Sequence, residues 1–262
     1  MHDIENLVTQ TLGKAIFNRL VRSLFTSRKK LTNFLAKTRT ISMKKKESYR
    51  NNLPHFQQPG QMYFVTWNLK DAVPRKALKN YTQKLEQLKN QIDFHRQQDS
   101  KSTKNEELKR EYQQLQKKYK KAYDDLLAIS KNNITDLSQS GNTQIISEAL
   151  LFWENKKLKT FAYSIMPNHV HWVIALYEKD ENGKPVYLQD ILQSVKRHTA
   201  NRINKREGKQ GNLWQKESFD TTIRDEKHLQ NAVEYTLNNP CSAGLVKDRN
   251  DWAGNYLCPD YL

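Results

Sequence analysis

Cysteine is scarce in this sequence, and long apolar runs are missing. The 262 residues include two cysteines, Cys241 and Cys258, which form no CxxC pair. Two such cysteines build no disulfide framework, so a reducing compartment is the natural expectation. No run of about 18 apolar residues occurs, so we expect no transmembrane helix. The N-terminus lacks the compact apolar stretch and cleavage site of a signal peptide. We therefore expect a cytoplasmic protein.

Acidic residues are too few to balance the basic ones. The chain has 44 lysines and arginines against 28 aspartates and glutamates, which gives a formal net charge of +16. Such an excess favours a polyanionic partner, because each phosphate that is neutralised releases bound counterions. A solvated basic surface is the alternative, which charge alone does not exclude. The length of 262 residues suffices for one good core or two small ones, and a hydrophobic content of 37% allows a folded domain.

The first 43 residues differ in character from the rest. Apolar residues recur there at roughly helical spacing, and basic residues lie among or just after them: Leu7, Leu12, Ile16, Leu20, Leu24, Arg19, Arg22, Arg28, Lys29 and Lys30. This pattern predicts a basic amphipathic helix that contacts DNA, a membrane surface or the body of the protein. We expect residues 1–43 to form a basic N-terminal extension and residues 44–262 to form the main domain.

Residues 76–130 carry two heptad patterns, separated by a polar patch at residues 97–103. The apolar positions are Leu78, Tyr81, Leu85, Leu88 and Ile92, then Leu108, Tyr112, Leu115, Tyr119, Ala122, Leu126 and Ile129. Steps of three and four predict helices with one apolar seam each, and an antiparallel hairpin would bury both seams. We therefore predict a helical hairpin inserted at about residues 76–130. Its outer lysines fit a solvated coiled-coil face slightly better than a DNA contact.

The remaining sequence alternates between strand and helix patterns. A strand is predicted at 62–67, a helix at 143–153, strands at 158–165 and 169–176, a helix at 188–206, and a loop followed by a strand at 214–223. Asp225 fits the N-cap of a last helix at 227–237, and Pro240 is expected to stop that helix.

Two histidines in the strand predicted at 169–176 are the first candidates for chemistry. Side chains at i and i+2 of a strand point to the same face, so His169 and His171 can both reach one divalent ion. Imidazole suits zinc, manganese and similar metals. An HxH pair on a strand fits two structural or surface histidines equally well.

The last predicted helix adds a possible nucleophile. Tyr235 and Asn239 lie four residues apart and hence on one helical face. Alone, a helical tyrosine is far more often a packing residue. Together with a metal site and a basic surface, however, it suits phosphoryl transfer to a phenolic oxygen through a covalent intermediate.

Several blocks of the sequence match, in order, a family of transposases. The blocks are Tyr63-Phe-Val-Thr-Trp-Asn-Leu69, Met166-Pro-Asn-His-Val-His-Trp-Val173, Leu192 to Asn204, Gly211 to Asp220, Ile223 to Pro240 and Ala243-Gly-Leu-Val246. They resemble the single-tyrosine HUH transposases and, within them, the REP-associated tyrosine transposases. The resemblance covers roughly residues 44–252, weakly across the helical hairpin. The MPNHVH block together with the YxxxNP block is highly specific.

This resemblance implies a fold, a reaction and a substrate. The implied fold is α+β and ferredoxin-like, with a central antiparallel sheet and flanking helices. His169 and His171 would bind Mg²⁺ or Mn²⁺, Asn239 would be the third protein ligand, and Tyr235 would be the nucleophile. The implied reaction is cleavage and rejoining of single-stranded DNA near palindromic hairpins, through a 5′-phosphotyrosine intermediate. We expect a monomer or homodimer with no membrane partner. The family often has arginine where Asn68 stands and valine where Cys241 stands.

Five further residues are candidates for DNA contacts. Lys196, Arg197, Arg202 and Arg224 are predicted to meet phosphates. For Lys196 and Arg197, plain solvation is an equal alternative. Trp214 is a candidate for stacking on unpaired bases, although a place in the core is favoured.

Three other functions compete with this reading. A nucleic-acid-binding regulator on the same fold would not cleave, and it would need neither Tyr235 nor both histidines. A metal-dependent hydrolase that uses water as the nucleophile would need further metal ligands. No such cluster has convincing spacing, since the histidines His2, His55, His95 and His228 are dispersed along the sequence. A structural coiled-coil protein would account for residues 76–130 alone.

Overall fold

The structure is a computed structural model, and it describes residues 48–50, 54–70, 72–73, 77–98, 103–129 and 135–261. The basic extension predicted at 1–43, with its amphipathic helix, lies outside the described residues. None of the described helices combines the length and apolar character that crossing a bilayer requires.

A five-stranded antiparallel sheet forms the centre of the molecule. Its strand order is β6-β3-β5-β4-β7, with bounds Phe219–Ile223, Met62–Asn68, His169–Leu176, Leu158–Ile165 and Asn255–Leu257. A separate pair, β1 (Ser48–Arg50) and β2 (Pro54–Phe56), precedes it. The predicted α+β class is confirmed at this level, and the ferredoxin-like assignment stays a prediction. Because β5 is central, both of its edges are hydrogen-bonded to neighbouring strands.

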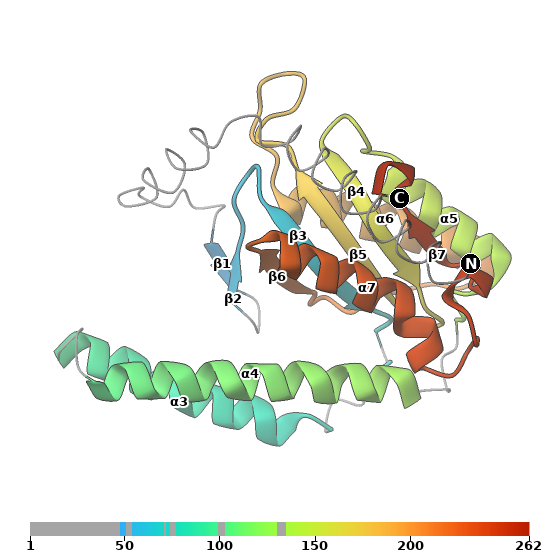
Figure 1. The fold of residues 1–262 in the computed structure, drawn as a ribbon. Helices are drawn as coiled ribbons and strands as arrows, with labels where there is room; N and C mark the ends of the chain where they lie inside the picture. The colour runs from blue at the N-terminus through green and yellow to red at the C-terminus, as the bar shows by residue number, and fades with distance from the viewer. Residues whose placement is uncertain are drawn as a thin grey trace, which may run out of the picture.

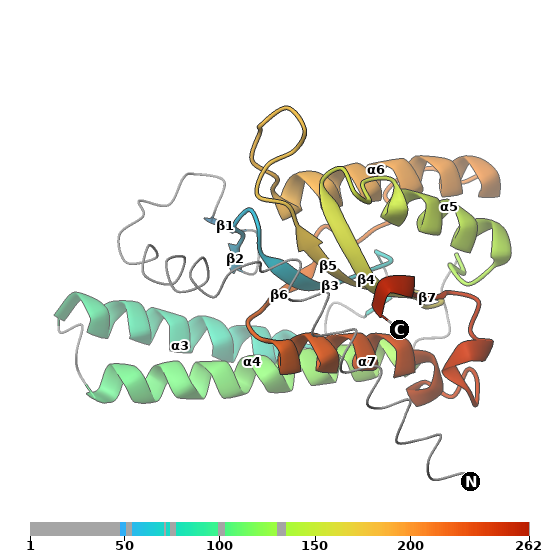
Figure 2. The same ribbon diagram turned by 45° about the horizontal axis from the view of Figure 1, so that its top comes forward.

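Helices cover both faces of this sheet. Helices α5 (Ser140–Leu151) and α6 (Leu188–Glu207) pack together on one face, and α7 (Glu226–Ser242) lies across the other face, over β4 and β5 (Figure 1, Figure 2). The chain ends with short 3-10 turns at Arg249–Asp251 and Pro259–Tyr261 on either side of β7. The sheet therefore separates two different environments.

Helices α3 (Lys79–Gln98) and α4 (Thr103–Ile129) lie side by side and project beyond the sheet (Figure 2). Tyr81 of α3 meets Tyr119 of α4 with ring centroids 6.2 Å apart, and Lys84 pairs with Glu111 at 3.8 Å. Residues later in α3 therefore meet residues earlier in α4, which makes the pair antiparallel. Helix α4 continues toward the sheet and ends beside α7 (Figure 1).

Helix α7 begins where the sequence predicts and ends later than the sequence predicts. The Asp225 carboxylate accepts a hydrogen bond from the His228 backbone N–H at 2.8 Å, so the predicted N-cap is confirmed. The prediction that Pro240 stops the helix is wrong, because α7 continues to Ser242 with Pro240 inside its last turn. Proline lacks one N–H but has a helical φ, and the Pro240 carbonyl still accepts from the Leu245 N–H at 2.9 Å.

The two faces of β5 enter two separate apolar clusters. Val170, Trp172 and Ile174 point toward α5 and α6 and join the larger cluster. Val173 points toward α7 and joins a smaller cluster with Phe64. His169 and His171 share the Val173 face because strand side chains alternate.

Strand β4 departs from regular alternation once. Its register against β5 shifts between Thr160 and Ala162. Phe161 and Ala162 both belong to the α7-side cluster as a result. A shift of this kind leaves an extra residue unpaired and re-aims the side chains around it.

Candidate active site

His169 and His171 meet in a buried place between the sheet and α7. The two side chains are 3% and 1% exposed, and their Nε2 atoms lie 3.1 Å apart. In the β3–β5 register, His169 stands opposite Asn68, and His171 stands opposite Thr66. The spacing of the HxH motif therefore brings both ring nitrogens to one point, as the alternation of a strand requires.

Each histidine is held through its other ring nitrogen. His169 Nδ1 lies 2.6 Å from Asn168 Oδ1, and His171 Nδ1 lies 2.9 Å from Thr66 Oγ1. The Asn168 amide nitrogen donates to the Leu127 carbonyl at 2.8 Å, which fixes the direction of the amide. Because an amide oxygen only accepts, His169 Nδ1 carries the proton and Nε2 keeps its lone pair.

The Thr66 hydroxyl suits either tautomer of His171. A hydroxyl can donate or accept, so His171 can carry its proton on Nε2, bonded to His169, or on Nδ1, bonded to Thr66. In the second tautomer both Nε2 lone pairs face the same point. Hydrogen bonds to the far nitrogen orient metal-binding histidines in this way.

Burial keeps His169 neutral. Desolvation lowers the pKa of His169 to about 3, against a smaller raising effect of a hydrogen bond with Asn239. A neutral imidazole is the form that binds a metal. The contact also brings Asn239, on the last turn of α7, to the histidine pair.

Tyr235 lies against the histidine pair and remains accessible. Its ring stands edge-on to His171 at 5.4 Å and to Phe64 at 5.7 Å between centroids. The side chain is 40% exposed. Its hydroxyl donates to Asp124 Oδ2 of α4 at 2.9 Å. Desolvation and the Asp124 carboxylate together raise the pKa of Tyr235, and a hydrogen bond with Asn239 lowers it.

The structure thus brings together the four residues that the sequence predicts for catalysis and metal binding: His169, His171, Tyr235 and Asn239. Among the described residues, no group of three histidines, cysteines or carboxylates is placed to hold a metal. A metal here would be bound by two imidazoles and the Asn239 amide oxygen, with the remaining positions open to water or phosphate. This donor set suits Mn²⁺ better than Mg²⁺, because imidazole tolerates Mg²⁺ less well, and convergent lone pairs on oriented imidazoles suit such an ion.

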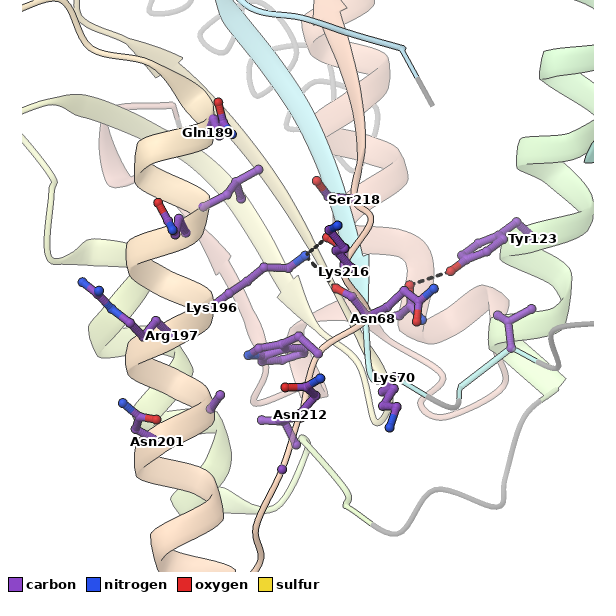
Figure 3. Close-up of a pocket in the computed structure, with 18 of the residues that line it drawn as sticks. Asn68, Lys70, Tyr123, Gln189, Lys196, Arg197, Asn201, Asn212, Lys216 and Ser218 are labelled. Carbon is purple, nitrogen blue, oxygen red and sulfur yellow. Dashed lines mark hydrogen bonds between the residues drawn. The ribbon is translucent and has the colours of Figure 1, made fainter. Parts of the chain in front are cut away.

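The predicted DNA contacts do not gather at the histidine pair. Lys196, Arg197 and Trp214 line a cavity of about 1040 Å³ between α6, the end of β3 and the base of the helical hairpin (Figure 3). Neither histidine lines this cavity. Arg202 and Arg224 are exposed and do not line it either.

The Lys196 side chain is hydrogen-bonded to the backbone of the protein. Its ammonium group, labelled in Figure 3, donates to the carbonyl oxygens of Gln215, Lys216 and Glu217, at 2.9, 3.3 and 3.2 Å. Burial lowers the pKa of Lys196 to about 8, opposed by the charge of Glu217. All three N–H bonds of the ammonium thus point at the backbone of this loop.

Trp214 lies in the core, the favoured one of its two predicted places. It is 8% exposed, and its indole N–H donates to Thr199 Oγ1 at 2.9 Å. Its ring meets Trp67 edge-on at 6.2 Å. The roles of Lys196 and Trp214 toward DNA stay predictions.

Three residues at the site escaped the sequence analysis: Thr66, Asn168 and Asp124. Thr66 and Asn168 lie within the motif blocks quoted above, and the register of an antiparallel pair could have placed Thr66 beside His171. Asp124 carries no signal of its own, because it lies among the charged positions of a heptad helix. Its place depends on the packing of α4 against α7.

Comparison with known proteins finds one family model that matches part of the chain. Residues 126–239 match the family model described as "Transposase IS200 like". This segment includes both histidines, Tyr235 and Asn239. The chain therefore contains a segment similar to the IS200-like transposases, over less than half of its length.

Among individual proteins, the chain is similar to one from Haemophilus influenzae that bears the name "Putative REP-associated tyrosine transposase". The two are 29% identical over 106 residues, which is 38% of this chain and 58% of that protein. The match therefore spans less than two thirds of that relative. A solved structure of a REP-associated tyrosine transposase bound to a REP hairpin aligns with 82% of this chain and 89% of its own, at 16% identity and a TM-score of 0.44.

Proposed function

We propose that this protein is a metal-dependent single-tyrosine transposase. It cleaves single-stranded DNA near palindromic hairpins and rejoins it through a 5′-phosphotyrosine intermediate. The observation that carries the proposal is the contact of an accessible Tyr235 with the buried His169–His171 pair, within a segment that matches the IS200-like transposases.

The histidine pair supports the metal requirement. His169, His171 and Asn239 would hold Mg²⁺ or Mn²⁺, with Asn168 and Thr66 orienting the two rings. When bound, the ion supplies positive charge that polarises the scissile phosphate and stabilises the charge that builds up on it. The low pKa of His169 keeps its ring available as a ligand throughout the neutral range.

Tyr235 supports the covalent route. Its phenolic oxygen attacks the phosphorus, the bond from phosphorus to O3′ breaks, and the DNA keeps a free 3′-hydroxyl on one side. The phosphotyrosine bond preserves the energy of the broken linkage, so a 3′-hydroxyl can later attack it without ATP. Tyr235 lies on a helix that packs on the sheet, so its ring is held beside His171 while the side chain stays 40% exposed.

The DNA hairpin as substrate comes from the family relation and agrees with the charge. The net charge of +16 favours a polyanion. Arg197, Arg202 and Arg224 are exposed cations that we propose as phosphate contacts. Arg224 directly precedes the N-cap of α7, the helix that carries Tyr235.

Covalent capture tests this proposal. The full chain is incubated with a pool of palindromic DNA hairpins that carry random single-stranded flanks, labelled at the 3′ end, with Mn²⁺, Mg²⁺ or EDTA. A denaturing gel should show a metal-dependent adduct that retains the 3′ label, because the 5′ phosphate stays on the protein. Tyr235→Phe should abolish the adduct and keep DNA affinity within about twofold. Tyr177→Phe, just past the far end of β5, is the matched control and should behave like the wild type.

Two results would separate the alternatives. Tight binding of hairpins without any adduct would support the non-cleaving regulator instead. Cleavage without an adduct, unaffected by Tyr235→Phe, would support a hydrolase that uses water.

A further inference from the structure

The end of α4 that lies against the sheet takes part in three hydrogen bonds around the histidine pair. The Leu127 carbonyl accepts from Asn168, whose oxygen bonds to His169. The Tyr123 hydroxyl donates to Asn68 Oδ1 at 2.6 Å (Figure 3). Asp124 accepts from the hydroxyl of Tyr235. The helical hairpin is thus built into the site.

These contacts hold the Asp124 carboxylate in a defined place. Tyr123, its neighbour in sequence, is 8% exposed and packs its ring against Phe219 with centroids 4.5 Å apart. Leu127, one turn later, is 2% exposed. An aspartate has a short side chain, so a fixed α4 backbone fixes the carboxylate within hydrogen-bond reach of the phenol.

We propose that Asp124 is a further catalytic residue, which accepts the phenolic proton of Tyr235 as that oxygen attacks the DNA. The inference rests on the proposed function and adds a proton acceptor to it. A general base must lie within about 2.6–3.2 Å of the proton donor, and the distance from Tyr235 Oη to Asp124 Oδ2 is 2.9 Å. The carboxylate is supplied by the helical hairpin, from outside the strand and helix that carry the other site residues.

The proton balance of the step is complete. In cleavage, the O–P bond of Tyr235 forms, the phenolic proton passes to Asp124, and the departing O3′ takes a proton from water. In rejoining, a 3′-hydroxyl attacks the phosphotyrosine and loses its proton to water, and the neutral Asp124 returns its proton to the Tyr235 oxygen as the O–P bond breaks. No oxidant or other co-reactant is needed.

The charge of Asp124 has two opposite effects on the tyrosine. In the resting state it favours the neutral phenol, in line with the raised pKa of Tyr235. During attack, the same carboxylate is the group to which the proton can move, so that a free phenolate need not form first. Removing the charge while keeping the shape separates these effects, because a resting-state restraint alone would make the neutral variant faster.

The test is the single-turnover rate of adduct formation on the best hairpin of the pool, at saturating DNA and over a series of Mn²⁺ concentrations. Asp124→Asn keeps the size and an accepting oxygen but does not take the proton, so the rate should fall about 100-fold. Asp124→Glu should recover at least a tenth of the wild-type rate. Asp125→Asn is the matched control, with the same chemical change on an exposed neighbour, and should stay within about twofold.

Binding and metal dependence show whether the effect lies in the chemical step. DNA affinity and the half-saturating Mn²⁺ concentration should be unchanged in Asp124→Asn. An Asp124→Asn rate equal to or above that of the wild type would overturn the role of Asp124 and leave the proposed function standing. A rate restored by tenfold more Mn²⁺ would also overturn it, because Asp124 would then act on the metal. If the wild type itself forms no adduct, the proposed function fails and this role fails with it.

Discussion

The two faces of β5 differ in character, because one is packed with apolar side chains and the other carries the two buried histidines. Toward α5 and α6, Trp172 is fully buried in the larger apolar cluster and meets Trp67 edge-on at 6.2 Å. Toward α7, His169 and His171 are equally buried but polar, and their nitrogens point at each other. One face stabilises the sheet, and the other uses the rigidity of that sheet to hold reactive groups.

The comparison shows why buried polar groups are tolerated here. With the His171 proton on Nε2, each ring nitrogen of the two histidines has a hydrogen-bond partner, and with that proton on Nδ1 the two Nε2 lone pairs are left for a metal ion. Thr66 comes from β3, and Asn168, the residue before β5, is itself held by the Leu127 carbonyl of α4. The site is therefore assembled from tertiary contacts, whereas the opposite face is largely apolar packing.

The largest expected effect belongs to the histidine face. His171→Ala removes a proposed metal ligand, so the rate of adduct formation should fall about 10³-fold or more, which corresponds to at least about 4 kcal/mol in activation free energy. The midpoint of thermal unfolding, measured with EDTA present, should change much less than for a core tryptophan. An adduct rate that stays metal-dependent and within tenfold of the wild type would remove His171 from the site.

Substitutions on the apolar face of β5 should lower the free energy of unfolding. Trp172→Ala empties a fully buried position and removes the hydrogen bond from the indole to Thr160 Oγ1, so unfolding free energy should fall by about 3 kcal/mol or more. Urea unfolding measures the loss. Below the melting range, the folded fraction should retain metal binding. A variant as stable as the wild type would show that the two faces are not divided in this way.

Lys196 is a charged residue away from the histidine pair, and its expected role is to stabilise the fold. Lys196→Met should lower the unfolding free energy by about 2 kcal/mol, since three carbonyl oxygens lose a charged donor. Its exposed neighbour provides the control: Arg197→Met should change stability by less than about 0.5 kcal/mol. DNA affinity measured on both variants separates the predicted phosphate contacts from support of the loop. Equal stability of the two variants would contradict the structural role of Lys196.

The smallest effect is expected at Thr66. Thr66→Val keeps the shape but removes the hydroxyl that orients His171, so Mn²⁺ affinity should fall about tenfold, or about 1.4 kcal/mol. Thr66→Ser retains a hydroxyl and should bind Mn²⁺ nearly as well as the wild type. Calorimetric titration measures both. An unchanged affinity for the valine variant would mean that His171 needs no orienting partner.

Much of this arrangement could be predicted from local sequence patterns. The strands at 158–165 and 169–176 occur as predicted, because alternating apolar residues flank the Met166-Pro167-Asn168 turn. Among the described residues, helices occur near each range where one was predicted, including α3 and α4. The four proposed catalytic and metal-binding residues come together because a strand period and a helix period bring each pair onto one face.

The rest depends on contacts that no local pattern contains. The bond between Asp124 and Tyr235 joins residues 111 positions apart. Lys196 looks like a surface cation on its helix, and only the return of the 215–217 loop buries it. Pro240 is a helix breaker by local rules, but near the end of α7 the lost N–H costs one bond only, so the helix continues.

The most direct test of the central claim is to locate the DNA on the protein. The covalent adduct is digested with protease and nuclease, and the peptide that carries nucleotide is sequenced by mass spectrometry. The account predicts one modified peptide from α7, with the 5′ phosphate on Tyr235. A nucleotide attached to any other of the twelve tyrosines, or to a serine or histidine, would contradict it.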